Sequence, residues 1–361
     1  MVDWLRSMVR TYEFYEVDPG TWKDKRPIRS ITSAKISRDL QSATLETASL
    51  NATEMFMECY VRIYLITVQD SITERHSLGT FLIQSPSKSF NGKVSNITID
   101  AYSPLIELND VQPPLGFTVM KEQNIMDNAY SLTRENLRAP VIKVNNVEDT
   151  MPTDFTAESD EKWLEYISAL MSIAKYGYAL DDYSRVLFVP TRELTSIQPV
   201  WTYDDDNSSI LYPDVSEDFD LFGVPNMVEV IYTGQGADGN TLILKSTAVN
   251  DNPDSPVSTV ARGRPVLHRE TNPSISGIPD QAYLDMYANN LLMNLSSVER
   301  KIVYSHGYCP VRYGDCVRLN YSRAGLKDIK AKVINQEIEC TSGGKVTETA
   351  VYATNLWKEG W

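Results

Sequence analysis

The chain has 361 residues, of which 42% are hydrophobic, 23% charged and 10% aromatic. This composition is typical of a globular protein and excludes a disordered, fibrous or membrane-embedded chain. At about 150 residues per domain, the length predicts two or three domains. The 48 Asp and Glu residues outnumber the 34 Lys and Arg residues, which leaves a net charge of -14. A protein this acidic is not expected to bind nucleic acid by neutralising its phosphates.

The N-terminal segment does not have the pattern of a signal peptide. Asp3, Arg6 and Arg10 interrupt it, and no apolar run of roughly seven residues follows. No stretch elsewhere approaches the roughly 18 apolar residues that a membrane-spanning helix needs. We therefore expect no membrane segment, and synthesis in a reducing cytosol.

The cysteines are too few for a disulfide scaffold: Cys59, Cys309, Cys316 and Cys340. Together with His306, the last three supply the ligand types of a zinc site. Zinc ligands usually come in closely spaced pairs, however, and Cys309 and Cys316 lie seven residues apart. We expect free thiols and no metal, and leave open whether these cysteines pair or bind a metal ion.

Residues 28–110 have the pattern of β-strands. Alternating β-branched and aromatic residues predict strands over residues 31–39, 60–68, 78–84 and 95–102. Asn91-Gly92 is typical of a hairpin turn between the last two. Strand 60–68 is apolar on both faces apart from Arg62 and Thr67. We therefore expect one of its faces on the core and the other against further protein.

From Pro113-Pro114 onward the pattern is mixed. Helical spacing predicts helices over residues 124–137 and 160–176, the second with an apolar stripe that includes Trp163 and Ile167. A strand over residues 185–190 follows. This segment is expected to be a connector between two β-rich halves.

The last part of the chain returns to strands and has an uneven charge distribution. Strands are predicted over residues 227–232, 241–249, 300–304, 316–321, 329–340 and 348–352, with a helix over 280–298. Residues 201–254 hold eleven Asp or Glu and one Lys, whereas residues 261–332 hold eleven Lys or Arg and six Asp or Glu. This asymmetry indicates an acidic surface beside a basic one, or contacts between subunits.

The short motifs favour structural interpretations. Residues 234–239 match G-x-G-x-x-G, but a β-branched run follows where a nucleotide site needs a helix, so we expect a hairpin loop. Residues 204–209 lack the ligand spacing of a calcium loop and are expected to form a turn. A glycosidase needs only two carboxylates, so acid–base chemistry stays open as an alternative.

Several short sequence segments, in a fixed order over nearly the whole chain, resemble those of the hub proteins of bacteriophage tails. They mark no catalytic centre. These segments are residues 12–19 with Trp22, 31–39, 78–88, 99–108, 224–230, 255–259 with 262–264, and 314–319.

The resemblance implies a mainly β fold: two tail-tube-like antiparallel β-barrel domains joined by a smaller α+β region. The expected domains are an N-terminal arm and first barrel over residues 1–112, a connector over 113–200, and a second barrel with helix 280–298 over 201–361. Late strands that return to complete the first barrel are an open alternative. Some relatives carry a fused peptidase or lysozyme domain, for which we expect no room after Trp361.

The resemblance also implies a function, that of a baseplate or tail-tip hub in the virion, made in the host cytoplasm. Three subunits would place six similar barrels in a ring that adapts the six-fold tail tube to a three-fold tip. The expected partners are two further copies, a tail tube or distal tail protein, a tip or spike protein, and a tape measure protein in the lumen. DNA would pass during genome ejection without specific binding, and we expect no cofactor, no metal and no enzymatic activity.

The candidate contact residues between subunits lie on one face of strand 60–68: Tyr60, Arg62, Tyr64 and Ile66. Two other functions stay open. One is a tail-associated enzyme that degrades the cell wall by Asp and Glu acid–base chemistry. The other is a β-sandwich that binds carbohydrate through exposed aromatic side chains.

Overall fold

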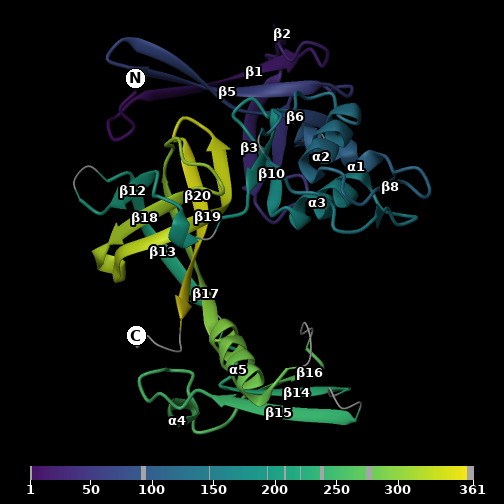
Figure 1. Cartoon of the computed structure of the whole chain (residues 1–361). Helices are drawn as coiled ribbons and strands as arrows, with labels where there is room; N and C mark the ends of the chain where they lie inside the picture. The colour runs from purple at the N-terminus through teal and green to yellow at the C-terminus, as the bar shows by residue number, and fades with distance from the viewer. Residues whose placement is uncertain are drawn as a thin grey trace. The chain divides into compact units, whose positions relative to one another are not determined.

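The computed structural model describes residues 2–90, 95–145, 147–192, 194–206, 209–219, 221–235, 240–273 and 279–355. Over these residues the chain is mainly β, with several helices gathered beside β6 and β10 (Figure 1). The expected mainly β class with a mixed connector is confirmed. By their internal contacts the residues form two compact units, one of residues 1–215 with 303–350 and one of 216–302 with 351–361.

A long sheet connects both ends of the chain. Its strands follow the order β13-β17-β20-β19-β3-β4-β7-β6-β5-β1-β2, with β18 beside β19 and β12 beside β18. The early strands are β1 (Val9–Val17), β2 (Asp24–Pro27), β3 (Ile31–Asp39), β4 (Glu46–Ala52), β5 (Tyr60–Gln69), β6 (Ile72–Phe90) and β7 (Ser95–Tyr102). The late strands are β12 (Trp201–Asp204), β13 (Leu211–Phe219), β17 (Ser297–Gly307), β18 (Cys316–Tyr321), β19 (Leu326–Cys340) and β20 (Lys345–Asn355).

The early strands form because their apolar residues alternate, as the sequence predicted. In β4 and β7 every second side chain is buried, including Leu50 and Ile99, and the strands curl around one core. The strands expected over 31–39 and 95–102 match β3 and β7, and the one over 60–68 is β5. The expected strand over 78–84 is the middle of the longer β6, and the Asn91-Gly92 turn lies outside the described residues.

Strand β19 belongs to two β halves at once. Residues from Leu326 to Lys332 pair with β18, whereas residues from Asn335 to Cys340 pair with β3. The alternative that late strands return to the first half is therefore confirmed. Ile338 and Cys340 also enter the core of the early strands. Within the first unit, one strand thus joins β18 to the early strands.

The connector between the halves holds η1 (Pro104–Ile106) and three helices, α1 (Glu107–Asp110), α2 (Ile125–Glu135) and α3 (Trp163–Ile173). It also contains η2 (Leu194–Ser196), which follows its small sheets, β8 (Thr118–Val119) with β9 (Phe155–Thr156) and β10 (Tyr176–Leu180) with β11 (Val186–Pro190). Helix α3 is shorter than the expected 160–176. Lys175 adopts a left-handed backbone with φ 58°, which ends the helix and turns the chain into β10.

The second unit contains a three-stranded sheet covered by a helix. The sheet order is β15 (Thr241–Val249), β14 (Met227–Gln235) and β16 (Leu267–Thr271), and the helices are α4 (Thr259–Arg262) and α5 (Gln281–Leu295). Asp280 caps α5 by accepting a hydrogen bond from the Tyr283 amide at 2.7 Å. The helix packs on β14 and β15 through Leu284, Ala288 and Leu292 (Figure 1).

Two sequence predictions about α5 were wrong. The helix ends at Leu295 and not at residue 298, because β17 begins at Ser297. The sequence also predicts an apolar stripe of Tyr283, Tyr287, Leu291 and Leu295 on this helix. The last three of these residues pack at the edge of the core, but its fully buried centre is Leu284, Ala288 and Leu292, and Tyr283 is 42% exposed. The helix is apolar on several sides, so its sequence did not determine which side would meet the sheet.

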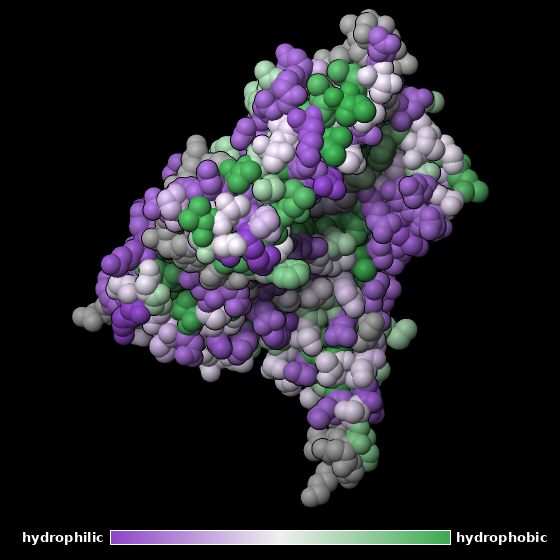
Figure 2. Space-filling view, turned by 90° about the horizontal axis from the view of Figure 1, so that it is seen from below, coloured by the Kyte–Doolittle hydropathy of each residue, from purple (hydrophilic) through white to green (hydrophobic). Residues whose placement is uncertain are grey.

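The expected domain borders at residues 112/113 and 200/201 stay a prediction, because both fall inside the first compact unit. The range 201–361 contains parts of both units. On the face shown in Figure 2, hydrophobic residues form separate patches between hydrophilic ones. Scattered patches of this kind are normal on protein surfaces and do not by themselves mark a docking site.

We predict that Gly79→Ala destabilises the protein much more than Gly116→Ala. Both glycines have positive φ angles, 140° and 76°. A Cβ on Gly79 would lie 2.8 Å from the fully buried Phe81 ring, whereas a Cβ on Gly116 would meet nothing within 4 Å. We expect a loss of about 1–2 kcal/mol for G116A from backbone strain and about 1–3 kcal/mol more for G79A from overpacking. Urea unfolding measures both, and equal losses would contradict this account.

Candidate functional site

The first unit contains a set of polar side chains, four of them almost completely buried, that joins the connector to both β halves. We call Arg38, Glu46, Asp182, Arg312, Gln336 and Glu348 the junction network. Arg38, Glu46, Gln336 and Glu348 are at most 1% exposed. Buried charges are costly unless they are paired and hydrogen-bonded, so their arrangement needs a structural or functional reason.

The connector reaches the network through the loop between β10 and β11. Asp181 shapes this loop by accepting hydrogen bonds from the Tyr183 and Arg185 amides, both at 2.9 Å. The Ser184 hydroxyl then accepts the Thr80 amide of β6 at 2.7 Å. Thr80 follows the irregularity in the β5–β6 pairing at Ile63 and Tyr64. The loop therefore provides an acceptor for the Thr80 N–H, a backbone donor beside the irregularity in the sheet.

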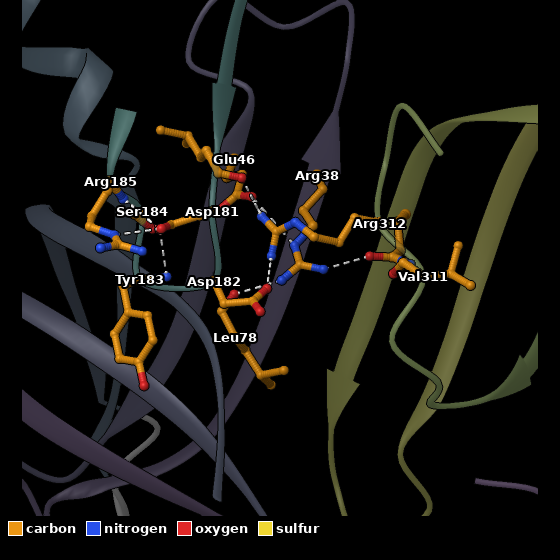
Figure 3. A network of polar contacts seen from close by, with 12 residues as sticks. Arg38, Glu46, Leu78, Asp181, Asp182, Tyr183, Ser184, Arg185, Val311 and Arg312 are labelled. Carbon is orange, nitrogen blue, oxygen red and sulfur yellow. Dashed lines mark hydrogen bonds and ion pairs between the residues drawn. The ribbon is translucent and has the colours of Figure 1, made fainter. Parts of the chain in front are cut away.

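Arg312 links this loop to the early strands. Its guanidinium donates to Asp182 at 2.5 Å, to Glu46 of β4 at 2.6 Å and to the Leu180 carbonyl at 3.0 Å. Figure 3 shows the Arg38 and Arg312 side chains lying between the connector loop and the late strands, close to Glu46 and Asp182. One side chain from the second half thus holds carboxylates from two other parts of the chain.

Arg38 and Gln336 carry the network onward into the second half. Arg38 of β3 donates to the Leu78 carbonyl and to the Gln336 side chain of β19, both at 2.7 Å. Gln336 in turn donates to the Val311 carbonyl at 2.9 Å and to Glu348 of β20 at 2.7 Å. The pairing of β19 with β3 is therefore reinforced by side chains that are almost completely buried.

Glu348 ends the network in a cluster of aromatic side chains. It accepts hydrogen bonds from Tyr304 at 2.6 Å and Tyr203 at 3.4 Å, and its other oxygen lies 3.3 Å from Nε2 of His306. Nδ1 of His306 lies 2.7 Å from the Gly307 carbonyl, the geometry of a donor. Both ring nitrogens thus face acceptors, which fits a protonated histidine.

The charges of this pair are set by competing effects on the two pKa values. Burial by itself would lower the pKa of His306, but the Glu348 carboxylate and hydrogen bonds to Cys309 and Glu348 raise it to about 10. Burial by itself would raise the pKa of Glu348, but the His306 charge and hydrogen bonds from His306, Tyr304 and Gln336 lower it. We conclude that the pair is ionised at neutral pH.

The structure also places His306 beside Cys309, which the sequence had grouped with it only as a possible zinc ligand. Sγ of Cys309 lies 3.8 Å from Nδ1 of His306, but this nitrogen faces the Gly307 carbonyl as a donor, so the protonated ring is not placed to act as a base for the thiol. The Cys309, His306 and Glu348 side chains are all fully buried, so a substrate has no access to the sulfur in this fold. All four cysteines are free thiols. Among the described residues, no group of three or more His, Cys, Asp and Glu side chains is arranged to hold a metal ion.

The candidate contact residues Tyr60, Arg62 and Tyr64 are 2%, 3% and 4% exposed in this chain. Tyr60 donates to Glu107 of α1 at 2.6 Å, and Tyr64 donates to Asp24 of β2 at 2.9 Å.

Arg62 packs between other parts of the same chain. It donates to Thr80, Asp24 and the Trp22 carbonyl, and its guanidinium lies 5.1 Å from the Tyr183 ring centroid. The second face of strand β5 thus meets further protein, as expected, but that protein is this chain. A contact between subunits at these positions stays a prediction, for which Ile66 is the partly exposed member.

The acidic and basic segments of the sequence also pair within the chain. In the second unit, Glu229 forms ion pairs with Lys245 and Arg269, and Glu217 lies 2.9 Å from Arg300. Some of these charged side chains therefore already form ion pairs within the chain, before any contact between subunits forms. Exposed pairs of this kind contribute about 0–1 kcal/mol each.

Comparisons with known proteins find similarity in structure and not in sequence. No protein-family model and no curated protein matches the sequence. Among solved structures, a tail protein from Neisseria meningitidis MC58 is 13% identical with a TM-score of 0.63, over 96% of this chain and 98% of its own. The 43 kDa tail protein of prophage MuSo2 from Shewanella oneidensis is 13% identical with a TM-score of 0.58, over 98% and 100%.

A chain of the Francisella PdpA–VgrG complex is 8% identical with a TM-score of 0.54, over 99% of this chain and 54% of its own. At these identities the similarity establishes the fold alone. The expected resemblance to phage tail proteins is thus confirmed for the fold. No helix among the described residues is long and apolar enough to cross a membrane.

We predict that Arg312→Gln lowers the free energy of unfolding by about 3–5 kcal/mol, because it leaves the buried Glu46 carboxylate without its closest cation. Arg323→Gln is the matched control. Its side chain is 73% exposed and 3.8 Å from Asp205, so we expect a loss of about 0–1 kcal/mol. Urea unfolding followed by fluorescence measures both. Similar losses would show that the junction network contributes little to stability.

We predict that His306→Gln changes the pH dependence of stability on the alkaline side. The native pKa of His306 lies above its unfolded value of about 6.5. Its contribution is therefore complete below about pH 6.5 and is lost as the pH rises through about 10. The lowered pKa of Glu348 acts in the opposite direction, with a contribution that is lost only as the pH falls below about 4.5.

The measurement is the free energy of unfolding at several values between pH 7 and 10. Wild type should lose stability over this range and H306Q should lose less, so that the difference between them shrinks toward pH 10. The exposed His268 provides the control, since H268Q should follow wild type throughout. Parallel curves for wild type and H306Q would exclude a charged His306.

Proposed function

We propose that this chain is a structural hub protein at the tip or baseplate of a phage-type tail, and that it acts as a homotrimer. Three copies with two β halves each would form a ring of six similar parts. Such a ring matches the six-fold tail tube on one side and a three-fold tip or spike on the other. The subunits would be made in the host cytoplasm and act in the virion.

The observation that carries the proposal is the shared strand β19, which pairs with β18 in one half and with β3 in the other. A ring in which three chains replace six subunits requires that the two halves of each chain keep a fixed orientation. The continuous sheet supplies this constraint, and the junction network adds buried side-chain contacts across it. The fold shared with the Neisseria and Shewanella tail proteins supports the same proposal.

The proposal includes partner proteins but no enzymatic activity. The ring would contact a tail tube or distal tail protein above, a tip or spike protein below, and a tape measure protein inside, and it would line the channel through which DNA leaves. The net charge of -14 suits such a channel, because like charges keep DNA from adhering. We propose no enzymatic activity, since the Cys309, His306 and Glu348 side chains are closed to substrates.

We predict that the purified chain forms a ring-shaped trimer. Light scattering over a range of concentrations should give three times the mass of the chain, and electron microscopy should show a ring with a central channel. The same preparation should not hydrolyse peptidoglycan. A chain that stays monomeric at every concentration and is absent from purified tail tips would overturn the proposal. Peptidoglycan hydrolysis that one Asp or Glu substitution abolishes would favour the enzyme instead.

A further inference from the structure

A pocket of about 690 Å³ lies beside the junction network in the first unit, and Arg312 belongs to both. Three parts of the chain line it: the turn between β3 and β4, the β10–β11 sheet of the connector with the segment after it, and the late strands around β18 and β19. We call it the junction pocket. Its volume lies within the range of about 300–1,000 Å³ that is common for ligand sites. It is therefore large enough for a small molecule or the end of a peptide.

The connector gives this pocket a small, apolar wall. In the antiparallel pair of β10 and β11, Gly177 lies opposite Val189, and both line the pocket. Ala179 also lines it, two residues further along β10, because side chains two apart in a strand share a face. The intervening pair, Tyr178 and Phe188, packs in the core of the connector on the other side. The wall is therefore apolar and carries little side-chain volume.

Gly177 leaves this wall open. A Cβ built on Gly177 would meet no described atom within 4 Å. Glycine in the interior of a strand weakens it, and it often marks a place where a ligand or another backbone approaches closely. Leu40 of the β3–β4 turn and Ile197 after η2 continue the apolar surface and are partly exposed. The fold thus leaves an apolar hollow that these side chains do not fill.

Cations line the same pocket. Arg192, exposed after β11, and Lys332, partly exposed on β19, form no ion pair with any residue that the structure describes. The third cation of the lining, Arg312, is already paired with Glu46 and Asp182. Two positive charges beside the apolar wall are therefore available to a ligand.

The pocket is positive although the chain is acidic. Among the described residues of the lining, Asp315 is the acidic one, and its carboxylate accepts the Arg312 amide at 2.8 Å. The described lining thus has three cations and one anion, in a chain whose net charge is -14. Charge of one sign that gathers in a cleft raises the local concentration of ligands of the opposite sign. The junction pocket therefore favours an anion.

We propose that the junction pocket binds the C-terminal end of a peptide from another protein, and that the last side chain of this peptide is apolar. That side chain lies against the small residues of β10 and β11, and the terminal carboxylate lies at Arg192 and Lys332. A guanidinium group binds a carboxylate through two parallel hydrogen bonds. Capture of a chain end through its carboxylate is one of the recurring modes of peptide recognition.

The form of the pocket favours a peptide end over a free ion or an enclosed molecule. The pocket is open to solvent on one side, so the rest of a peptide can continue outward. Inorganic phosphate would meet the cations but would leave the apolar wall uncovered. All the lining residues belong to the first unit of one chain, so the proposal goes beyond the hub role and does not depend on a ring.

The test measures the binding of labelled synthetic peptides to the full-length chain by fluorescence anisotropy. The probe is a short peptide that ends in leucine with a free carboxylate. One comparison peptide ends in leucine with an amide, which removes the charge, and another ends in serine, which removes the apolar side chain. The leucine acid should bind at least about ten-fold more tightly than either comparison peptide, because it alone engages both the cations and the apolar wall.

Two variants and a matched control locate the binding. R192Q/K332Q removes both available cations and should lower the affinity for the leucine acid to that of the amide. G177L fills the hollow and should weaken binding of the leucine acid by at least about ten-fold. K23Q/K327Q removes two exposed lysines outside the pocket and should bind like wild type. Thermal unfolding checks that each variant is folded.

Four results would overturn the proposal. Equal binding of the acid and the amide by wild type would show that the cations hold no terminal carboxylate. A loss of affinity in K23Q/K327Q as large as in R192Q/K332Q would show unspecific attraction of charge. Displacement of the peptide by an equal concentration of inorganic phosphate would make the pocket a simple anion site. No binding by wild type at about 1 mM peptide would remove the site.

None of these results bears on the proposed function. The trimer is measured separately, by light scattering and electron microscopy, and a chain that is monomeric would still contain the whole junction pocket. Failure of the hub proposal and failure of the peptide site are therefore distinguishable.

Discussion

The structure depends on the buried carboxylate of Glu46, which needs cationic partners. Glu46 is fully buried, and the cations that approach it come from β3 and from the turn before β18. Removing a carboxylate from water costs several kcal/mol, which is recovered only when the partner geometry is good. Arg312 also holds Asp182 of the connector. Glu46 therefore has its cationic partners only when β3 and the turn before β18 come together, and Arg312 joins the connector to the same point through Asp182.

The shared strand and the junction network constrain the same joint in two ways. Strand β19 fixes the two halves through backbone hydrogen bonds, whose register is set by the alternation of Ile338 and Cys340 toward the core. The hydrogen bonds of Gln336 with Arg38 and Glu348 cross the same strand in the interior. A slip of one residue would point Gln336 outward and leave both charged neighbours without it. The buried polar groups thus reinforce the register that the apolar alternation sets.

The faces of the sheet in the first half differ in their exposure and in the kind of side chains they carry. The face of β5 that carries Tyr60 and Arg62 is largely covered by the connector and the β1–β2 turn. The side chains of β3 and β4 that point away from the core, such as Ser37, Thr47 and Ser49, are partly exposed. This difference between the faces is compatible with the structural role that we propose.

The sequence by itself determined the local elements. The alternation in residues 31–39 and 95–102 gave β3 and β7, since a period of two places successive side chains on opposite faces of any strand. The helical spacing after residue 124 gave α2, and the composition gave a globular, acidic chain. Each of these properties depends on residues that are close together in the chain.

Only the tertiary structure decided which elements meet. Glu46 and Arg312 are 266 residues apart, and no local pattern links them. The same is true of the pairing of β19 with β3, the burial of Tyr60, Arg62 and Tyr64 by their own chain, and the displaced stripe of α5. Such contacts follow from the order of strands in the sheet, and that order is a property of the whole chain because it depends on contacts between segments far apart in the sequence.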